Sequence, residues 1–173
     1  MCKFLLPVAF LLLLASIGYS QDREKLNLSI GIGHNESSNL GVRYQFNQMQ
    51  FGLGFGTKFG QKRGNRPEIF TGEFFYHFAG TAELSIRRPW YLRNGLVLRK
   101  ENTPNLRTLT WLYNLRLGRE FNISRKIGVS LDGGILTRLR ERTKKIRPNG
   151  WPDDSVEFPI EPSFGFNFYY RFF

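Results

Sequence analysis

The chain has 173 residues, a formal net charge of +11 at pH 7 and one cysteine. Its mean hydropathy is −0.33, although 16% of its residues are aromatic. These values exclude a mature protein that crosses a membrane with apolar helices, each of which needs about 20 consecutive apolar residues. They favour strands in which apolar and polar side chains alternate.

The N-terminus has the three parts of a secretory signal peptide. Lys3 supplies the positive charge, residues 4–17 are apolar, and residues 18–20 (GYS) form a small-residue cleavage site. The apolar segment is shorter than a membrane-spanning helix of about 20 residues. We therefore expect Sec-dependent export, cleavage of residues 1–20, and one domain formed by residues 21–173.

The mature chain is basic and lacks cysteine. Removing Lys3 from the 25 basic residues leaves 24 against 14 acidic residues, a net charge of +10. Such a charge suits an anionic partner such as a nucleic acid or a membrane surface. Because the chain is exported, we expect no nucleic-acid partner. Because Cys2 lies in the signal peptide, we expect no disulfide.

Eight segments alternate apolar and polar residues with the period of two that is typical of β-strands. The first seven are residues 26–33, 40–47, 49–59, 69–79, 90–99, 107–118 and 127–139. In the eighth, residues 162–173, every even position from Phe164 to Phe172 is aromatic. The odd-numbered segments are followed by polar loops, which are residues 34–39, 60–67, 100–105 and 140–157. Short links follow the second and sixth segments, and residues 80–89 fit either a strand or a loop.

This order predicts an all-β fold, an eight-stranded antiparallel up-and-down barrel. A closed barrel pairs the last strand with the first, so that no edge is left without a partner. In an up-and-down barrel, successive loops lie at opposite ends, which agrees with the alternating loop lengths. The sequence has no internal repeat and no linker, which indicates one domain.

The alternation fits both a soluble barrel with an apolar interior and a transmembrane β-barrel with an apolar exterior. Three features favour the transmembrane barrel. The chain ends in a strand, whereas soluble calycin-type barrels usually add a helix. Aromatic residues gather toward strand ends on the apolar face, as at membrane interfaces: Tyr44, Phe46, Phe59, Trp90, Tyr170 and Phe172. The polar face mixes glycine with opposite charges, as in a narrow packed lumen: Arg43, Glu73, Arg93, Asn114, Arg116, Asp132 and Arg171.

The chain resembles the small eight-stranded outer-membrane barrels of Gram-negative bacteria, of the OmpA-transmembrane and OmpX type. The most specific part is the last strand with its alternating aromatics and terminal Phe173, which is similar to the signal that the barrel-assembly machinery reads. In the family the terminal aromatic shares the parity of the run, whereas here the run ends at Phe172. The resemblance implies an outer-membrane location in a Gram-negative bacterium and contact with outer-membrane lipid and lipopolysaccharide. It implies no single function.

The two histidines are the candidates for catalysis. His34 has Ser37 and Ser38 nearby, and some lipid A-modifying barrels use His with Ser, but a solvated loop histidine fits the same residues. His77 lies on the polar face and is expected to be a hydrogen-bond partner in the lumen. No residues have the spacing of metal ligands. We expect no catalytic, metal or cofactor site.

A basic segment near the C-terminus is the candidate binding site. It fits contact with lipopolysaccharide phosphates, contact with an acidic partner, or a solvated loop. Trp151 is either a partner anchor or a plug on the barrel rim. The candidate anion-binding or partner-binding residues are Arg138, Arg140, Arg142, Lys144, Lys145, Arg147 and Trp151.

These observations predict a non-enzymatic outer-membrane protein with a packed polar lumen. Its expected role is structural or interactive, for example as an accessory subunit of a larger envelope complex. The first alternative is a lipid A-modifying enzyme, and the second is a secreted soluble ligand-binding barrel. The expected partners are outer-membrane lipid, lipopolysaccharide, the assembly machinery and another envelope protein.

Overall fold

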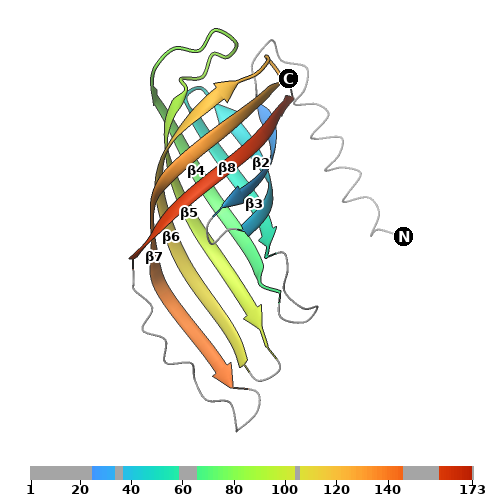
Figure 1. Ribbon diagram of the computed structural model, residues 1–173, viewed down its shortest axis with the longest axis vertical. Coiled ribbons are helices and arrows are strands. Elements are labelled where there is room, and N and C mark those ends of the chain that lie inside the picture. Colours follow the sequence, from blue (N-terminus) through green and yellow to red (C-terminus); the bar gives the residue numbers. More distant parts are fainter. Residues whose placement is uncertain (1–24, 34–36, 59–65, 104–105, 146–159, 173) are drawn as a thin grey trace, which may run out of the picture.

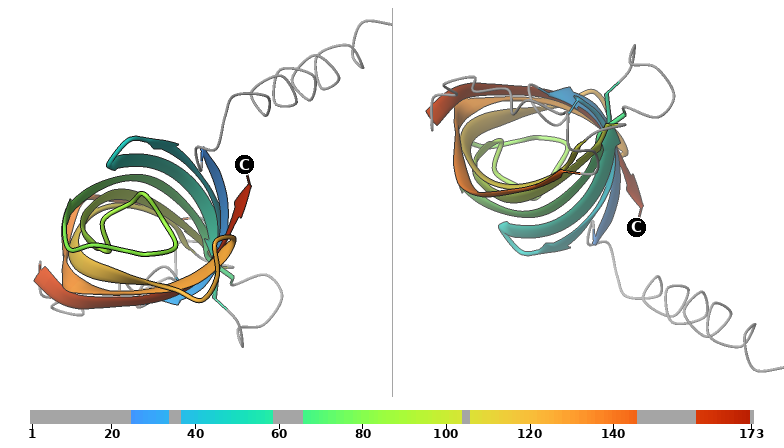
Figure 2. Two further views of the ribbon diagram at one scale, coloured as in Figure 1. Left: turned by 90° about the horizontal axis from the view of Figure 1, so that it is seen from above. Right: turned by 90° about the horizontal axis from the view of Figure 1, so that it is seen from below.

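The computed structural model describes residues 25–33, 37–58, 66–103, 106–145 and 160–172, which form eight strands. The strands are β1 (Leu26–Gly33), β2 (Ser37–Phe46), β3 (Met49–Thr57), β4 (Glu68–Ala79), β5 (Trp90–Asn102), β6 (Leu106–Asn122), β7 (Ile127–Lys145) and β8 (Ile160–Phe172). Figure 1 shows the strands from the side, and Figure 2 shows them from the two ends. In this part of the chain, no helix is long and apolar enough to cross a membrane.

Each strand pairs antiparallel with the next, and β8 pairs with β1 to close the barrel. The closing pair runs from Leu26 opposite Phe172 to Gly33 opposite Gly165. The aromatic last strand therefore has the first strand as its partner, as predicted. The predicted fold class, an all-β eight-stranded antiparallel up-and-down barrel, is confirmed.

The apolar side chains of the strands point outward and the polar side chains point into the lumen. Leu53 on β3 is 75% exposed, whereas Arg116 on β6 is 0% exposed. Large exposed apolar side chains occur on all eight strands. A continuous apolar exterior of this kind is typical of a wall that faces lipid. The predicted arrangement, with an apolar exterior and a polar lumen, is therefore confirmed.

Several strands are longer than the sequence pattern indicated. β2 begins at Ser37, and β5 runs to Asn102, so parts of two predicted loops belong to strands. β7 has 19 residues and continues to Lys145. The prediction that residues 140–145 lie in a loop was therefore wrong. The reason is the ladder with β6, which continues until Leu106 lies opposite Lys145. β5, β6 and β7 extend past the other strands at the end away from Phe172 (Figure 1).

Residues 80–89, which the sequence left open, form a loop that covers one end of the barrel. In Figure 2 this green loop crosses the barrel opening. It begins at Gly80, whose φ of 84° lies in the left-handed region that favours glycine. Gln48 in the β2–β3 turn holds it, since its Nε2 donates to Ile86 O at 3.0 Å and its Oε1 accepts from Arg88 N at 2.9 Å. As a result, Arg87 is buried at 2% exposure.

The lumen is filled by side chains in layers. Ile69, Val97, Leu112 and Leu136 form a buried apolar cluster. Phe75, which breaks the sequence alternation of β4, is also buried, at 1% exposure. Its ring lies under the guanidinium carbon of Arg43, 4.4 Å from the ring centroid. The Phe75 ring thus stabilises Arg43 inside the lumen, because a guanidinium group is stabilised over an aromatic face.

Candidate functional site: the packed lumen and the outer wall

Five charged side chains form a network of ion pairs at the centre of the lumen. Glu73 accepts from Arg93 and lies 3.6 Å from Arg43 Nε. Arg93 Nη1 lies 3.4 Å from Asp132 Oδ2, and Arg116 Nη1 lies 2.9 Å from Asp132 Oδ1. Each of the five side chains is at most 9% exposed. Each carboxylate therefore joins two arginines, which offsets the cost of removing these charges from water.

The hydroxyl groups of Tyr91 and Ser163 make hydrogen bonds to this ion-pair network. Tyr91 Oη donates to Asp132 Oδ2 at 3.0 Å. Arg116 Nε donates to Ser163 Oγ at 2.9 Å. Charge-assisted hydrogen bonds of this kind are stronger than neutral ones. The network therefore ties β5, β6, β7 and β8 together across the lumen.

A second charged cluster closes the lumen at the end covered by the 80–89 loop. Arg87 Nη2 lies 2.8 Å from Glu120 Oε2, and Arg87 Nη1 donates to Gln45 Oε1 at 2.6 Å. Arg171 on β8 lies 3.7 Å from the same Glu120 oxygen. Arg171 also donates to Asn122 and lies over the Tyr169 ring, 4.8 Å from its centroid. The loop thus plugs the barrel with an arginine that is paired inside it.

Glycines make room for these side chains. A Cβ at Gly52 would lie 3.2 Å from Arg43 Cγ and 3.3 Å from Glu73 Oε2. A Cβ at Gly118 would lie 2.3 Å from Tyr91 Cζ. The interpretation of the β3 glycines as space for lumen arginines, rather than as a phosphate-binding loop, is confirmed for Gly52.

The two histidines differ in what the structure describes of them. His77 is 1% exposed; its Nδ1 lies 2.7 Å from Arg88 O and its Nε2 lies 3.4 Å from Gln50 Oε1. Its expected role as a hydrogen-bond partner in the lumen is confirmed. His34 lies outside the described residues. Among the described residues, no cluster of three His, Cys, Asp or Glu could hold a metal ion.

The basic segment on β7 divides at a register shift. Opposite Trp111 and Leu112 of β6, the strand has one extra residue, Leu139, because Trp111 pairs with Arg140 and Leu112 pairs with Arg138. Such a β-bulge changes the direction of the side chains that follow it. Arg138 lies on the lumen side and its Nη1 is 3.0 Å from Glu141 Oε2.

After the bulge, three basic side chains of β7 lie on the outer wall. Arg140 lies opposite Trp111, Arg142 opposite Leu109, and Lys144 opposite Arg107. Directly opposite residues share one face of the sheet. Since Trp111 is 41% exposed on the outer wall, this face is the outer one. Lys145 ends β7, and Arg147 and Trp151 lie outside the described residues.

Arg107 is a basic residue of this surface that sequence reasoning missed. It is exposed and stands directly opposite Lys144. The register could not be read from the sequence, because a period-two pattern places residues 138, 140, 142 and 144 on one face and shows no bulge. Only the pairing with β6 separates Arg138 from the other three.

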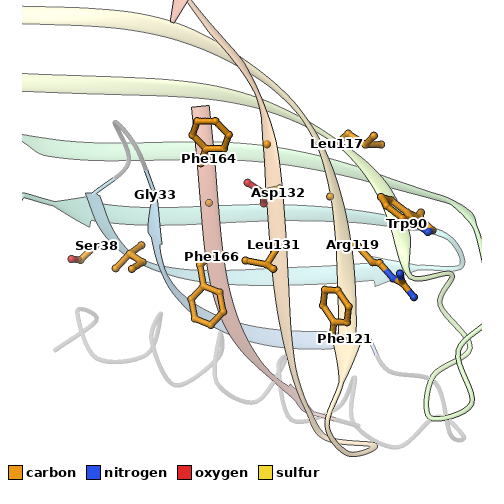
Figure 3. Close-up of a pocket in the computed structure, with 14 residues that line it drawn as sticks. Gly33, Ser38, Trp90, Leu117, Arg119, Phe121, Leu131, Asp132, Phe164 and Phe166 are labelled. Carbon is orange, nitrogen blue, oxygen red and sulfur yellow. The ribbon is translucent and has the colours of Figure 1, made fainter. Parts of the chain in front are cut away.

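A groove on the outer wall is lined by residues of β5 to β8 and by Ile32 and Gly33 of β1 and Ser38 of β2 (Figure 3). The Arg119 guanidinium carbon lies 5.4 Å from the Trp90 ring centroid and 5.1 Å from the Phe121 ring centroid. Gly133 lies in the groove, where the Phe164 ring would be 3.3 Å from an added Cβ. A cation held between aromatic rings fits the interface between lipid tails and headgroups.

These features together define an eight-stranded β-barrel of the transmembrane type with a filled lumen. No protein-family model matches the chain, and no curated protein matches it. Among solved structures, the chain is similar to the crystal structure of the N-terminal β-barrel domain of Pseudomonas aeruginosa OprF. The TM-score is 0.58, with 12% sequence identity over 88% of this chain and 100% of that one. At this identity the likeness shows the shared barrel fold alone.

Proposed function

We propose that the protein is an integral barrel of the outer membrane that acts through its surfaces, as a non-enzymatic structural or interaction protein. The observation that carries this proposal is the contrast between the two faces of the barrel. The outer face carries large apolar side chains on all eight strands, whereas the lumen is filled by paired charges and covered by the 80–89 loop. A filled lumen leaves no room for a wide aqueous pore.

The apolar exterior also argues against a secreted soluble barrel. Leu53, Phe46 and Phe164 are each more than 60% exposed on the outer wall. A soluble protein rarely exposes such a continuous apolar surface. Outer-membrane insertion explains this surface, and the likeness to the OprF barrel domain agrees with it. The predicted signal peptide supplies the export step.

His77, the histidine that the structure describes, gives no support to lipid A modification, which would have to rely on His34. Both of its ring nitrogens are within 3.4 Å of Arg88 O and Gln50 Oε1. A catalytic histidine instead needs a nucleophile within hydrogen-bond reach and an orienting carboxylate. The proposed role includes that of an accessory subunit in a larger envelope complex.

Fractionation of cells that produce the full chain tests the membrane placement. We expect the protein in the outer-membrane fraction, with a gel mobility that changes on boiling because the closed barrel resists detergent until it is heated. Recovery in the soluble fraction without such a change would contradict the proposal.

Two further measurements test whether the protein acts as a pore or as a lipid A-modifying enzyme. In planar bilayers, the purified protein is expected to show no large steady conductance. The lipid A mass spectrum of the producing cells is expected to be the same for wild type and His34→Ala. A steady pore, or an acyl chain whose presence depends on His34, would replace the interaction role.

A further inference from the structure

The β-bulge on β7 creates a cationic surface on the outer wall that the sequence parity hides. We name it the outer basic ladder and define it as Arg107, Arg140, Arg142 and Lys144. Three of its members follow the bulge on β7, and Arg107 comes from the neighbouring strand β6. Along the strand, Arg140 and Lys144 are about 13 Å apart, at about 3.3 Å per residue.

The ladder is exposed and repels itself. All four side chains are exposed. Arg107 and Lys144 stand directly opposite each other, and like charges in this position are destabilising. Within the described part of the chain, no carboxylate lies at ion-pair distance from any of the four. The nearby Glu141 is on the other face, where it pairs with Arg138. An anion at the ladder would remove this repulsion.

The position of the ladder on the wall indicates the kind of anion. Apolar side chains lie beside it on the same outer face, since Leu109 is opposite Arg142, Trp111 is opposite Arg140, and Leu139 directly precedes Arg140. Trp111 and Leu139 are 41% and 57% exposed. This apolar part is continuous with the lipid-facing wall. A small free anion or a soluble acidic protein would bind the cationic residues but would make no favourable contact with the apolar surface next to them. An amphipathic molecule with a phosphate above an apolar body matches both parts.

From this arrangement we infer that the outer basic ladder binds the phosphate groups of an outer-leaflet lipid, lipopolysaccharide, whose acyl chains lie against the wall below. The inference rests on the proposed outer-membrane placement. Long loops and strand extensions face outward in such barrels and short turns face inward, so the extended end of β6 and β7 reaches the outer leaflet. Arginine is suited to phosphate because its planar donors bind two oxygens at once.

The test measures binding of purified phosphorylated lipid A to the detergent-solubilised full barrel at several salt concentrations. The variant is Arg140→Gln/Arg142→Gln. The matched control is Arg125→Gln/Lys126→Gln, which removes two exposed charges from the β6–β7 turn at the opposite end. Each cation near an anionic lipid surface contributes about fivefold in affinity. We expect about a 25-fold loss for the variant, less than twofold for the control, and a wild-type affinity that falls as salt rises.

Two comparisons identify the ligand. Dephosphorylated lipid A is expected to bind wild type as weakly as phosphorylated lipid A binds the variant. Inorganic phosphate is expected to displace lipid A no better than chloride at equal ionic strength. Equal binding by wild type and variant, an equal loss in the control, or full displacement by inorganic phosphate would overturn the inference. So would loss of a copurifying acidic protein from the variant with lipid A binding unchanged.

The boiling-dependent gel shift of each variant separates this inference from the proposed function. If the variant shifts like wild type but binds lipid A equally well, the ladder is not a lipid site and the barrel assignment stands. If wild type itself shows no shift and stays soluble, the membrane placement has failed and the inference fails with it.

Discussion

Asp132 is the carboxylate on which the central lumen network depends most. It lies 2.9 Å from Arg116 Nη1 and 3.4 Å from Arg93 Nη1, and it accepts from Tyr91 Oη at 3.0 Å. Asp132→Asn keeps the size of the side chain and removes its charge. Two buried arginines then lose a shared carboxylate. Since breaking a buried pair leaves a charge without compensation, we expect a loss of about 3–5 kcal/mol in the free energy of unfolding.

The expected loss is measured against an exposed pair of nearly the same length. Lys100 Nζ lies 3.0 Å from Glu68 Oε2, and both side chains are 48% exposed. Glu68→Gln should cost about 0–1 kcal/mol, because water screens such a pair and solvates the lysine left behind. The two variants thus differ mainly in burial. Urea unfolding of the barrel in lipid vesicles, followed by the boiling-dependent gel shift, gives both free energies.

A double variant, Asp132→Leu/Arg116→Met, provides the second comparison. Removing both partners leaves no charge unpaired between them, so part of the lost stability should return. If Asp132→Asn cost no more than Glu68→Gln, the lumen charges would be as well solvated as surface charges. The view of the lumen as a dry packed network would then be wrong.

Three other substitutions test separate parts of the barrel. Leu53→Arg puts a charge on the lipid-facing wall at the middle of β3, where it should cost about 2–4 kcal/mol and lower the folded fraction in vesicles; folding equal to that of Leu53→Phe would contradict the inside-out assignment. Gly118→Ala brings a Cβ to 2.3 Å from the Tyr91 ring, whereas Gly72→Ala meets nothing within 4 Å. The first should therefore cost about 1–3 kcal/mol by overpacking, and equal unfolding midpoints would show that the ring moves freely. Arg87→Ala removes the plug paired with Glu120, so bilayer conductance should rise relative to the exposed-site variant Arg125→Ala, and an unchanged conductance would place the barrier elsewhere in the lumen.

The barrel itself was predictable from the sequence because each strand has one apolar and one polar face. A period of two fixes which side chains share a face, and the aromatic run from Phe164 to Phe172 needed a partner strand, which closure of the barrel supplies. The lumen residues followed from the same parity, and even Phe75, which broke it, lies where its position in the strand places it. The alternation of apolar and polar residues within each strand was therefore enough to predict the fold.

Strand ends and register shifts were not predictable in the same way. Residues 140–145 are mostly charged and read as a loop, but their backbone pairs with β6 along its whole length. Hydrogen bonding between strands does not depend on hydrophobicity once both faces can be solvated. The position of Leu139 as an extra residue is likewise fixed by the partner strand. The loop at residues 80–89 has no period-two pattern because its position depends on contacts with distant residues. Gln48 binds its backbone, and Arg87 pairs with Glu120 inside the lumen.

The two ends of the barrel carry different kinds of charge for a physical reason. At the short-turn end, Arg87 and Arg171 are buried and share Glu120, so their charges are compensated inside the protein. At the extended end, Arg140 and Arg142 face outward beside apolar side chains and have no such compensation among the described residues. A folded protein keeps buried charges only when they are paired, but it can keep an unpaired exposed cluster when a partner or solvent accepts it. The inner charges therefore hold the barrel closed, and the outer charges are the ones available to a ligand.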